Sequence, residues 1–291
     1  MWYLSMLLTL LRACSSDPIV IHEDAIVGGE AFEWERITVE DGKPEVNVAS
    51  IPHGSSVFLH YVKSLISDDE ARRLIGLCDE REGWFRSPIK ATLEVDAKGG
   101  DPKSDDLASV RTSSSCPLLW PFAYRLLETE PLAYGEQGKM LQEEFSLVLR
   151  LSRRVARLLK LEDYYYVEPL QLVRYTHGEY YQTHHDHGRW YGRISESRPY
   201  TLLLFLNSVP EADKGGHTSF PSLKIKILHR LGDAILWSNV DPNDLGDEPR
   251  ILPEALHEAV GILQESTTKY VANVWISDRP APLTDEVFVT K

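Results

Sequence analysis

The sequence contains no run of about 18 or more apolar residues, which excludes a conventional membrane-spanning helix. Basic residues are in the minority, since the 291-residue chain has 31 Lys and Arg against 44 Asp and Glu, a formal net charge of -13. Because a nucleic-acid backbone is bound by clustered Lys and Arg, nucleic acid is not expected as a partner. An acidic surface favours solubility and suits a basic peptide substrate.

Cysteine is scarce, with three in the chain, and none has the close spacing of a metal clip. Cys14 lies in segment 1–15, which we interpret as a candidate signal peptide or short anchor, because small residues follow an apolar run. The run lacks a basic flank, and membrane association is expected only if the segment is retained. Cys78 and Cys116 remain as a candidate disulfide in an oxidising compartment, a pairing that two cysteines do not decide.

Two amphipathic helices are expected in the first half of the chain. In the first, Ser67 and Glu70 have the spacing of a capping box, and apolar residues recur at helical spacing. A longer pattern covers 139–161 with an apolar stripe. Its arginines fall largely off that stripe, which favours a solvated face: Arg150, Arg153, Arg154 and Arg157. Residues 16–55 are acidic and interrupted by Pro and Gly, and we interpret them as a linker or N-terminal arm.

From Tyr164 the chain changes to short β-rich runs separated by turns. The runs are 167–175, 180–186, 200–206, 217–220, 225–228, 234–237, 255–260 and 270–276. Many short strands with turns between them indicate a sandwich or barrel. Because the helices precede the strands, we expect an α+β fold with the N-terminal helices packed on one sheet of a jelly roll.

A histidine-rich window lies between Tyr175 and Trp190. On a strand, successive side chains alternate between faces, so His184 and Asp186 point the same way. Together they are two members of the 2-His-1-carboxylate ligand set, which leaves open positions on non-haem Fe(II). A polar surface turn is the simpler interpretation, and the opposite face offers a competing pair, His185 and His187. The window alone does not choose between the two registers.

Two residues further along the chain could complete such a site. His257 lies in the run EALHEAV, whose alternation permits an inward imidazole, although a core or rim histidine is the more frequent case. Lys269 begins the apolar run KYVANVWI. It could lay its stem on apolar surface and keep its charge in water, or it could be a fixed cation that pairs with a carboxylate.

The order of these motifs resembles that of one enzyme family. The runs LISDDEARRLIGL, RTSSS, EPLQLVRYTHGEYYQTHHD, RPYTLLLFLNSVPEADKGGHTSFP, LGDAILWSN, LHEAVGIL and KYVANVWI resemble the prolyl 4-hydroxylase α-subunit-like branch of Fe(II)/2-oxoglutarate dioxygenases. The resemblance implies a dioxygenase domain over 56–279, built on a double-stranded β-helix of the jelly-roll or cupin type, and a C-terminal tail, 280–291. It implies 4-hydroxylation of a peptidyl proline, in which O2 supplies the hydroxyl oxygen and 2-oxoglutarate is decarboxylated to succinate and CO2. L-ascorbate is implied as the reductant.

The same resemblance implies roles for individual side chains. The implied iron ligands, which favour the first register, are His184, Asp186 and His257. Lys269 is expected to pair with the distal carboxylate of 2-oxoglutarate, because a charge-assisted contact is strong in a dry pocket. Tyr175 and Thr218 are expected to hydrogen-bond near that carboxylate. The iron ligands and Lys269 would together form the catalytic set.

Tyr181 and Arg198 match family positions that contact or close over the peptide, although the first could be a core aromatic and the second a surface ion pair. This chain departs from the family at three places. The turn before Lys269 is longer than usual, His217 stands where glutamate is usual, and Trp237 is followed by serine where the family has Phe-Trp. Moving an aromatic by one strand position turns it to the other face, so the peptide groove is expected to differ.

We therefore expect a 2-oxoglutarate-dependent dioxygenase of the endoplasmic reticulum and secretory pathway, or of the cytoplasm if segment 1–15 is not a signal. The alternatives are the same chemistry on another side chain or small molecule, and a catalytically silent jelly roll that only binds. The sequence leaves open the peptide motif, the oligomeric state and any partner subunit.

Overall fold

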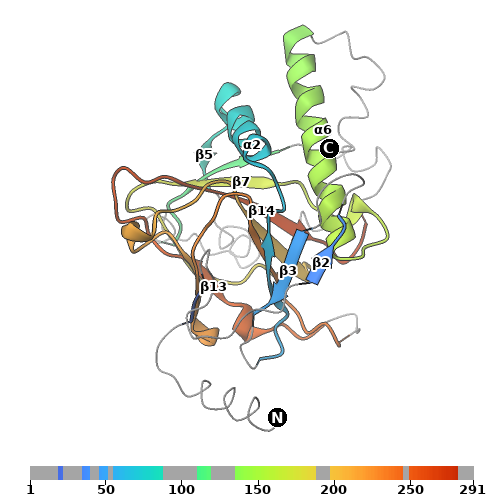
Figure 1. The fold of residues 1–291 in the computed structure, drawn as a ribbon, viewed down its shortest axis with the longest axis vertical. Coiled ribbons are helices and arrows are strands. Elements are labelled where there is room, and N and C mark those ends of the chain that lie inside the picture. The colour runs from blue at the N-terminus through green and yellow to red at the C-terminus, as the bar shows by residue number, and fades with distance from the viewer. Residues whose placement is uncertain are drawn as a thin grey trace, which may run out of the picture.

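The computed structural model describes residues 19–21, 35–39, 46–51, 55–87, 110–118, 135–187, 197–244 and 249–280. The predicted signal or anchor and most of the predicted C-terminal tail lie outside these residues. Figure 1 shows strands gathered in the lower part of the molecule, with two helices, α2 and α6, above them. Within the described ranges, no helix is long and apolar enough to cross a membrane.

Eight strands form a jelly roll, which confirms the predicted double-stranded β-helix. They are β7 (Gln171–Tyr175), β8 (Tyr181–His184), β9 (Tyr200–Phe205), β10 (Thr218–Phe220), β11 (Ile225–Ile227), β12 (Ala234–Ser238), β13 (His257–Ala259) and β14 (Lys269–Ile276). One sheet contains β7, β14, β9 and β12 side by side, and the other contains β8, β13, β10 and β11. Each predicted β-rich run overlaps one of these strands, so the α+β prediction is also confirmed.

Further strands extend both sheets. They are β1 (Ile19–Ile21), β2 (Glu35–Ile37), β3 (Val46–Ser50), β4 (Leu59–Lys63), β5 (Phe85–Arg86) and β6 (Ser114–Pro117). The larger sheet has the order β2-β3-β4-β12-β9-β14-β7-β6-β5, and the smaller has the order β1-β11-β10-β13-β8. Part of the predicted linker or arm, 16–55, therefore pairs with the domain through β1, β2 and β3.

Short 3-10 helices lie in the connections between these elements. They are η2 (Tyr164–Tyr166), η3 (Glu211–Asp213), η4 (Pro221–Leu223) and η5 (Pro253–Ala255). The last of them directly precedes β13, and its end sets the position at which His257 enters the smaller sheet.

Alternation along the strands divides the apolar side chains between two cores. In β9, Leu203 and Phe205 belong to the core between the two sheets, together with Phe220 of the smaller sheet. Leu202 and Leu204 belong to the second core, which lies beneath α2 (Asp68–Glu80) and α6 (Gly135–Leu158). Because both faces of β9 are buried, its sequence is a continuous apolar run instead of an alternating one.

Helix α2 begins at the predicted capping box and is fixed to the sheet near its other end. The Ser67 side chain accepts a hydrogen bond from the Glu70 N–H, and the Glu70 carboxylate accepts one from the Ser67 N–H. Near the end of the helix, Cys78 is disulfide-bonded to Cys116 of β6. The candidate disulfide is therefore present, and it covalently links the helical layer to the larger sheet.

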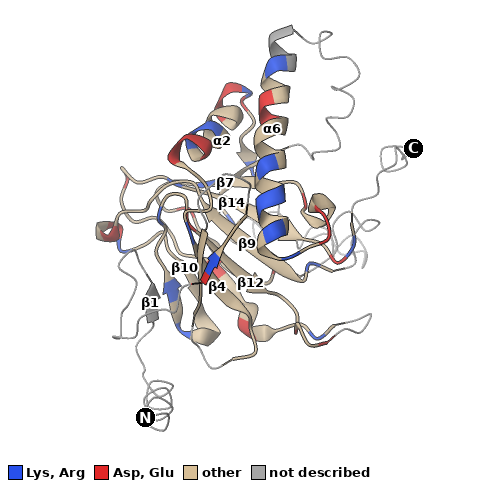
Figure 2. Ribbon diagram, turned by 45° about the vertical axis from the view of Figure 1, so that its right-hand side comes forward, with Lys and Arg blue, Asp and Glu red and all other residues tan. Residues whose placement is uncertain are grey.

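Ion pairs join α2 to α6, and one of them corrects the prediction of a solvated arginine face. Arg154 is 2% exposed, and its guanidinium donates to the two carboxylate oxygens of Glu70 at 2.7 and 2.9 Å. Arg150 and Arg153 are exposed as predicted. Figure 2 shows basic residues spaced along α6 and acidic residues on α2. The apolar stripe predicts which face of α6 is buried in the core. It does not show that a polar face of the same helix also contacts α2.

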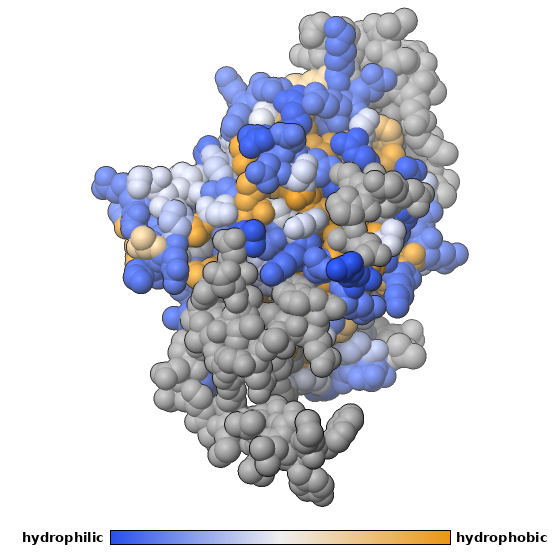
Figure 3. All heavy atoms as spheres, viewed as in Figure 1, coloured by the Kyte–Doolittle hydropathy of each residue, from blue (hydrophilic) through white to orange (hydrophobic). Residues whose placement is uncertain are grey.

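The surface agrees with the composition. Figure 3 shows hydrophilic side chains over most of the described surface on the side viewed in Figure 1, with hydrophobic atoms visible between them. Most apolar residues of the strands belong to the two cores.

We expect Arg154→Met to destabilise the protein by about 3–5 kcal/mol, because the Glu70 carboxylate would stay buried without its cation. The matched control is Arg153→Met, an exposed position on the same helix, which should change the stability by less than about 0.5 kcal/mol. Chemical denaturation followed by circular dichroism measures both free energies of unfolding. Equal losses in the two variants would show that the buried pair does not hold α2 on α6.

Candidate metal centre and adjoining pocket

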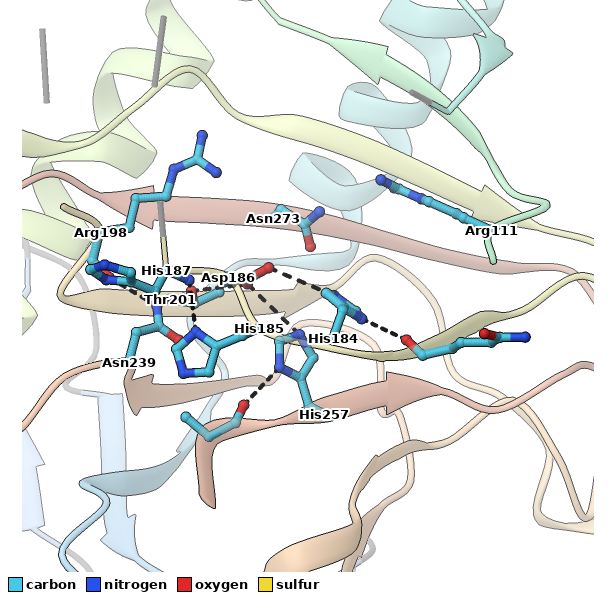
Figure 4. A network of polar contacts seen from close by, with 12 residues as sticks. Arg111, His184, His185, Asp186, His187, Arg198, Thr201, Asn239, His257 and Asn273 are labelled. Atoms are coloured by element: carbon cyan, nitrogen blue, oxygen red, sulfur yellow. Dashed lines mark hydrogen bonds and ion pairs between the residues drawn. The ribbon is translucent and has the colours of Figure 1, made fainter. Parts of the chain in front are cut away.

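Three metal-binding side chains converge at one end of the smaller sheet. His184 ends β8, Asp186 follows two residues later, and His257 begins β13 directly opposite His184 in the antiparallel pair. The Nε2 atoms of both histidines lie 3.7 Å from a carboxylate oxygen of Asp186. One donor atom from each residue lies within 4.8 Å of the others, so the three could hold one ion (Figure 4).

Hydrogen bonds fix the orientation of both imidazoles. Nδ1 of His184 lies 2.8 Å from the Gln182 carbonyl oxygen, and Nδ1 of His257 lies 3.0 Å from that of Ala255. A carbonyl only accepts, so each Nδ1 carries the proton and each Nε2 directs its lone pair toward Asp186. Burial, reinforced by His257, lowers the pKa of His184 to about 3. Neutral imidazole is the form that binds a metal.

The competing register is directed elsewhere. Nε2 of His185 lies 3.0 Å from the Leu252 carbonyl oxygen, and its Nδ1 accepts a hydrogen bond from the His187 backbone N–H. The His187 ring lies next to Ser197, whose hydroxyl oxygen is 3.4 Å from its Nδ1. Neither histidine belongs to the convergent group, so the ambiguity within the window is resolved by geometry.

A chain of hydrogen bonds behind Asp186 was not anticipated from the sequence. Thr201 Oγ1 donates to Asp186 Oδ2 at 3.0 Å, and Asn239 Nδ2 donates to Thr201 Oγ1 at 2.9 Å. The Trp237 indole N–H in turn donates to Asn239 Oδ1 at 3.1 Å. Thr201 and Trp237 belong to β9 and β12 of the larger sheet, and Asn239 directly follows β12. The Asp186 carboxylate is therefore held from the larger sheet, as Figure 4 shows for Thr201 and Asn239. A threonine inside an apolar strand carries no local signal of this role.

Lys269 lies inside the sandwich. It begins β14 opposite Tyr175 of β7, is 1% exposed, and its Nζ lies 5.0 Å from the centre of the Tyr175 ring. Its Nζ has no hydrogen-bond partner among the described residues. Burial lowers the pKa of Lys269 to about 7 and raises that of Tyr175. A buried ammonium without a partner is costly, and it is suited to receive an anionic ligand.

The longer turn before Lys269 is accommodated by a buried carboxylate. Asp213 is 2% exposed, and its two oxygens accept hydrogen bonds from the backbone N–H groups of Gly215, Leu263 and Gln264. These bonds fix the connection between β13 and β14 against the turn that precedes β10. Lys269 therefore reaches an inward position despite the extra residues.

Thr218 begins β10 of the smaller sheet, directly after His217. Thr218 is 2% exposed, and its Oγ1 lies 2.8 Å from Nε2 of His229. Burial, Lys226 and Lys269 together lower the pKa of His217 to about 4. The charge of Lys269 also contributes to the low pKa of His229, after burial. The charge of Lys269 is thus felt by two histidines next to Thr218, one adjacent in sequence and one in hydrogen-bond contact.

The residues predicted to contact substrate have specific partners. Tyr181 is stacked on His184, with ring centroids 3.5 Å apart, and the Arg111 guanidinium lies over the Tyr181 ring, 4.6 Å from its centre. Arg198 donates to both oxygens of Glu168 at 2.9 and 2.7 Å. Arg111, which is 5% exposed, is a further residue that the sequence did not assign to the site. The serines that follow it in the run RTSSS indicated only that this segment is polar.

Comparisons with known proteins find the following similarities. The family model described as the 2OG-Fe(II) oxygenase superfamily matches residues 170–277. The chain is 30% identical over 231 residues to prolyl 4-hydroxylase 13 of Arabidopsis thaliana, and this match covers 69% of this chain and 80% of the plant protein. It is 25% identical over 257 residues to the human transmembrane prolyl 4-hydroxylase, covering 71% of this chain and 50% of the human protein.

Among solved structures, the chain is similar to the viral collagen prolyl hydroxylase vCPH from Paramecium Bursaria Chlorella virus-1. The TM-score is 0.48 with 21% sequence identity, and the match covers 77% of this chain and 96% of the viral chain.

We expect His184→Ala and Asp186→Ala to weaken metal binding by at least about a hundredfold, because each removes one of only three protein donors. His185→Ala and His187→Ala are the matched controls in the same window, and both should bind the metal as the unaltered protein does. Titration with Fe(II) under anaerobic conditions, or with Mn(II), measures the four affinities. Similar losses in all four variants would mean that the metal is held by a different set of donors.

Proposed function

The chain belongs to the prolyl 4-hydroxylase-like 2OG-Fe(II) oxygenases, and we propose that it hydroxylates a peptidyl proline at C4 with release of succinate and CO2. Membership of this superfamily implies Fe(II) and 2-oxoglutarate, and makes the chain a 2-oxoglutarate-dependent dioxygenase. The proposal is carried by the convergence of two imidazoles and one carboxylate, in the same sandwich as a buried ammonium that has no hydrogen-bond partner among the described residues.

His184, Asp186 and His257 are the proposed iron ligands. The donor set suits ferrous iron, because two neutral imidazoles and one carboxylate occupy part of its coordination sphere and leave positions for a cosubstrate and O2. Bound iron would supply the oxidative decarboxylation of 2-oxoglutarate and the insertion of one oxygen atom into the substrate C–H bond. The protein's part is to hold the donors, with Thr201 fixing the carboxylate through its hydrogen bond.

Lys269, Tyr175 and Thr218 are the proposed anchors for the distal carboxylate of 2-oxoglutarate. The unpartnered ammonium of Lys269 supports this assignment, since a carboxylate would supply the partner that its buried position otherwise lacks. Thr218 and Tyr175 offer hydroxyl groups from opposite sheets. Such fixed contacts would orient the keto acid so that its other end faces the metal.

Apolar side chains surround the proposed metal site. The rings of Trp237 and Phe220 have centroids 4.7 and 5.8 Å from that of His257, and both residues are almost completely buried. These walls would exclude water from one side of the metal and strengthen the polar contacts within the pocket. Trp237 thus faces the interior, where it is unavailable to a peptide on the outer surface.

Tyr181 and Arg198 are the proposed peptide contacts, and Arg111 is added to them. The Tyr181 ring contacts both His184 and the Arg111 guanidinium, so a proline ring close to the metal would lie against these aromatic and planar surfaces. Arg198 would act mainly by shaping the pocket, because Glu168 already occupies its guanidinium.

We propose that the protein acts in the endoplasmic reticulum and secretory pathway, with L-ascorbate as the reductant that returns oxidised iron to the ferrous state. The buried disulfide between Cys78 and Cys116 supports an oxidising compartment, because structural disulfides are rare in the reducing cytoplasm.

The test is succinate release in the presence of Fe(II), 2-oxoglutarate, ascorbate and O2, with and without a poly-proline peptide. We expect the peptide to stimulate turnover and to gain the mass of one oxygen atom on proline. Turnover without stimulation would favour another substrate for the same chemistry. No turnover under any condition would favour a catalytically silent binding module.

The affinity for 2-oxoglutarate should fall with rising pH above about 7, where the free protein loses the proton of Lys269. Binding of the anion needs the ammonium form of Lys269 and raises the pKa of that group. At high pH each further pH unit should therefore lower the affinity up to about tenfold, and binding should take up one proton. Calorimetry with the Mn(II)-loaded protein, in buffers of different ionisation enthalpy, measures the affinity and the proton uptake. In Lys269→Arg, whose guanidinium stays charged, the affinity should be lower but independent of pH. A flat profile for the unaltered protein would contradict the assignment.

A further inference from the structure

His229 is a buried histidine that the proposed chemistry does not use. It follows β11, is 3% exposed, and its ring is stacked on that of Phe205 with centroids 4.0 Å apart. Phe205 lies in the core between the two sheets, so the imidazole lies in the interior of the sandwich. Its Nε2 is 2.8 Å from Thr218 Oγ1, whereas its Nδ1 has no hydrogen-bond partner among the described residues.

The imidazole of His229 is neutral. Burial lowers its pKa well below the usual value, and the charge of Lys269 and the neighbouring His217 lower it further. Among the described residues its ring contacts are with the Phe205 ring and the Thr218 hydroxyl, and neither group carries a negative charge that would offset the cost of burying a cation. A neutral ring has one N–H and one lone pair, so two tautomers are open to it.

The two tautomers differ in what they leave unsatisfied. With the proton on Nδ1, a buried N–H would have no acceptor, and the Thr218 hydroxyl would donate to His229 and point away from the pocket. With the proton on Nε2, His229 donates to Thr218 Oγ1, and only a lone pair is left without a partner. Buried donors without acceptors are rarer in proteins than under-satisfied acceptors, so the second tautomer is favoured.

We infer that His229 is a positioning residue for the cosubstrate: it donates from Nε2 to Thr218 and so turns the Thr218 hydroxyl proton toward the distal carboxylate of 2-oxoglutarate. The inference rests on the proposed function, because it needs that carboxylate beside Lys269. A chain of hydrogen bonds from imidazole to hydroxyl to carboxylate polarises each member and strengthens the last contact. It adds a directed donor to the pocket without a second buried charge.

The test is calorimetric titration of 2-oxoglutarate into Mn(II)-loaded protein, which measures binding without turnover. His229→Phe keeps an aromatic ring on Phe205 but removes the donor, and it should weaken 2-oxoglutarate binding about fivefold to tenfold with unchanged Mn(II) affinity. His229→Gln, which can place an amide N–H near the position of Nε2, should recover most of the loss. Thr218→Val should weaken binding at least as much as His229→Phe.

The double variant carries the decisive comparison. If His229 acts through Thr218, His229→Phe should have almost no further effect in the Thr218→Val background, because the two residues form one unit. Effects that multiply, or a His229→Phe protein that binds 2-oxoglutarate normally, would overturn the inference while leaving the proposed function intact. Failure of the unaltered Mn(II)-loaded protein to bind 2-oxoglutarate would overturn both.

Nitrogen NMR of the unaltered protein tests the same point without a substitution. In protein labelled with ¹⁵N-histidine and loaded with Zn(II) and 2-oxoglutarate, the resonances of His229 should be those of a neutral ring protonated at Nε2. A ring protonated at Nδ1 would overturn the inference even if a variant failed to fold.

Discussion

The antiparallel pairing of β8 with β13 is the constraint on which the rest of the site depends. It sets His184 directly opposite His257, although the two residues are far apart in the sequence. Side chains opposite each other in such a pair are close enough to share a ligand. The backbone ladder thus fixes two donors, and the third needs only to be held beyond the end of β8. Thr201, from the other sheet, does this with one hydrogen bond to Asp186.

The same sandwich buries polar groups that would be unfavourable in an ordinary core. Lys269 and His229 each have a buried nitrogen without a partner among the described residues, a state that lowers stability. Other contacts in the fold offset this cost. Two apolar cores, the disulfide between Cys78 and Cys116, and the buried ion pair of Arg154 with Glu70 hold the layers together. These contacts allow the fold to tolerate the buried polar nitrogens between its sheets.

The side chains around the candidate metal centre are held by specific contacts. Arg198 is held by Glu168, Arg111 lies over Tyr181, and Trp237 faces inward toward His257. A tryptophan one strand position further along would lie on the other face of the sheet, and a changed peptide groove stays a prediction.

Much of this protein is determined by the sequence alone, because strands, helices and caps depend on residues close together in the chain. The apolar run of β9, the capping box of Ser67 and the position of α6 all follow from such local patterns. Local spacing also reduced the metal donors to two registers around His184, but it could not choose between them without a resemblance to known proteins. Only the tertiary structure decided which histidines converge, that Arg154 is buried, and that Thr201, Arg111 and His229 adjoin the site. These facts depend on distances between segments remote in sequence, and such distances are set by sheet pairing and packing.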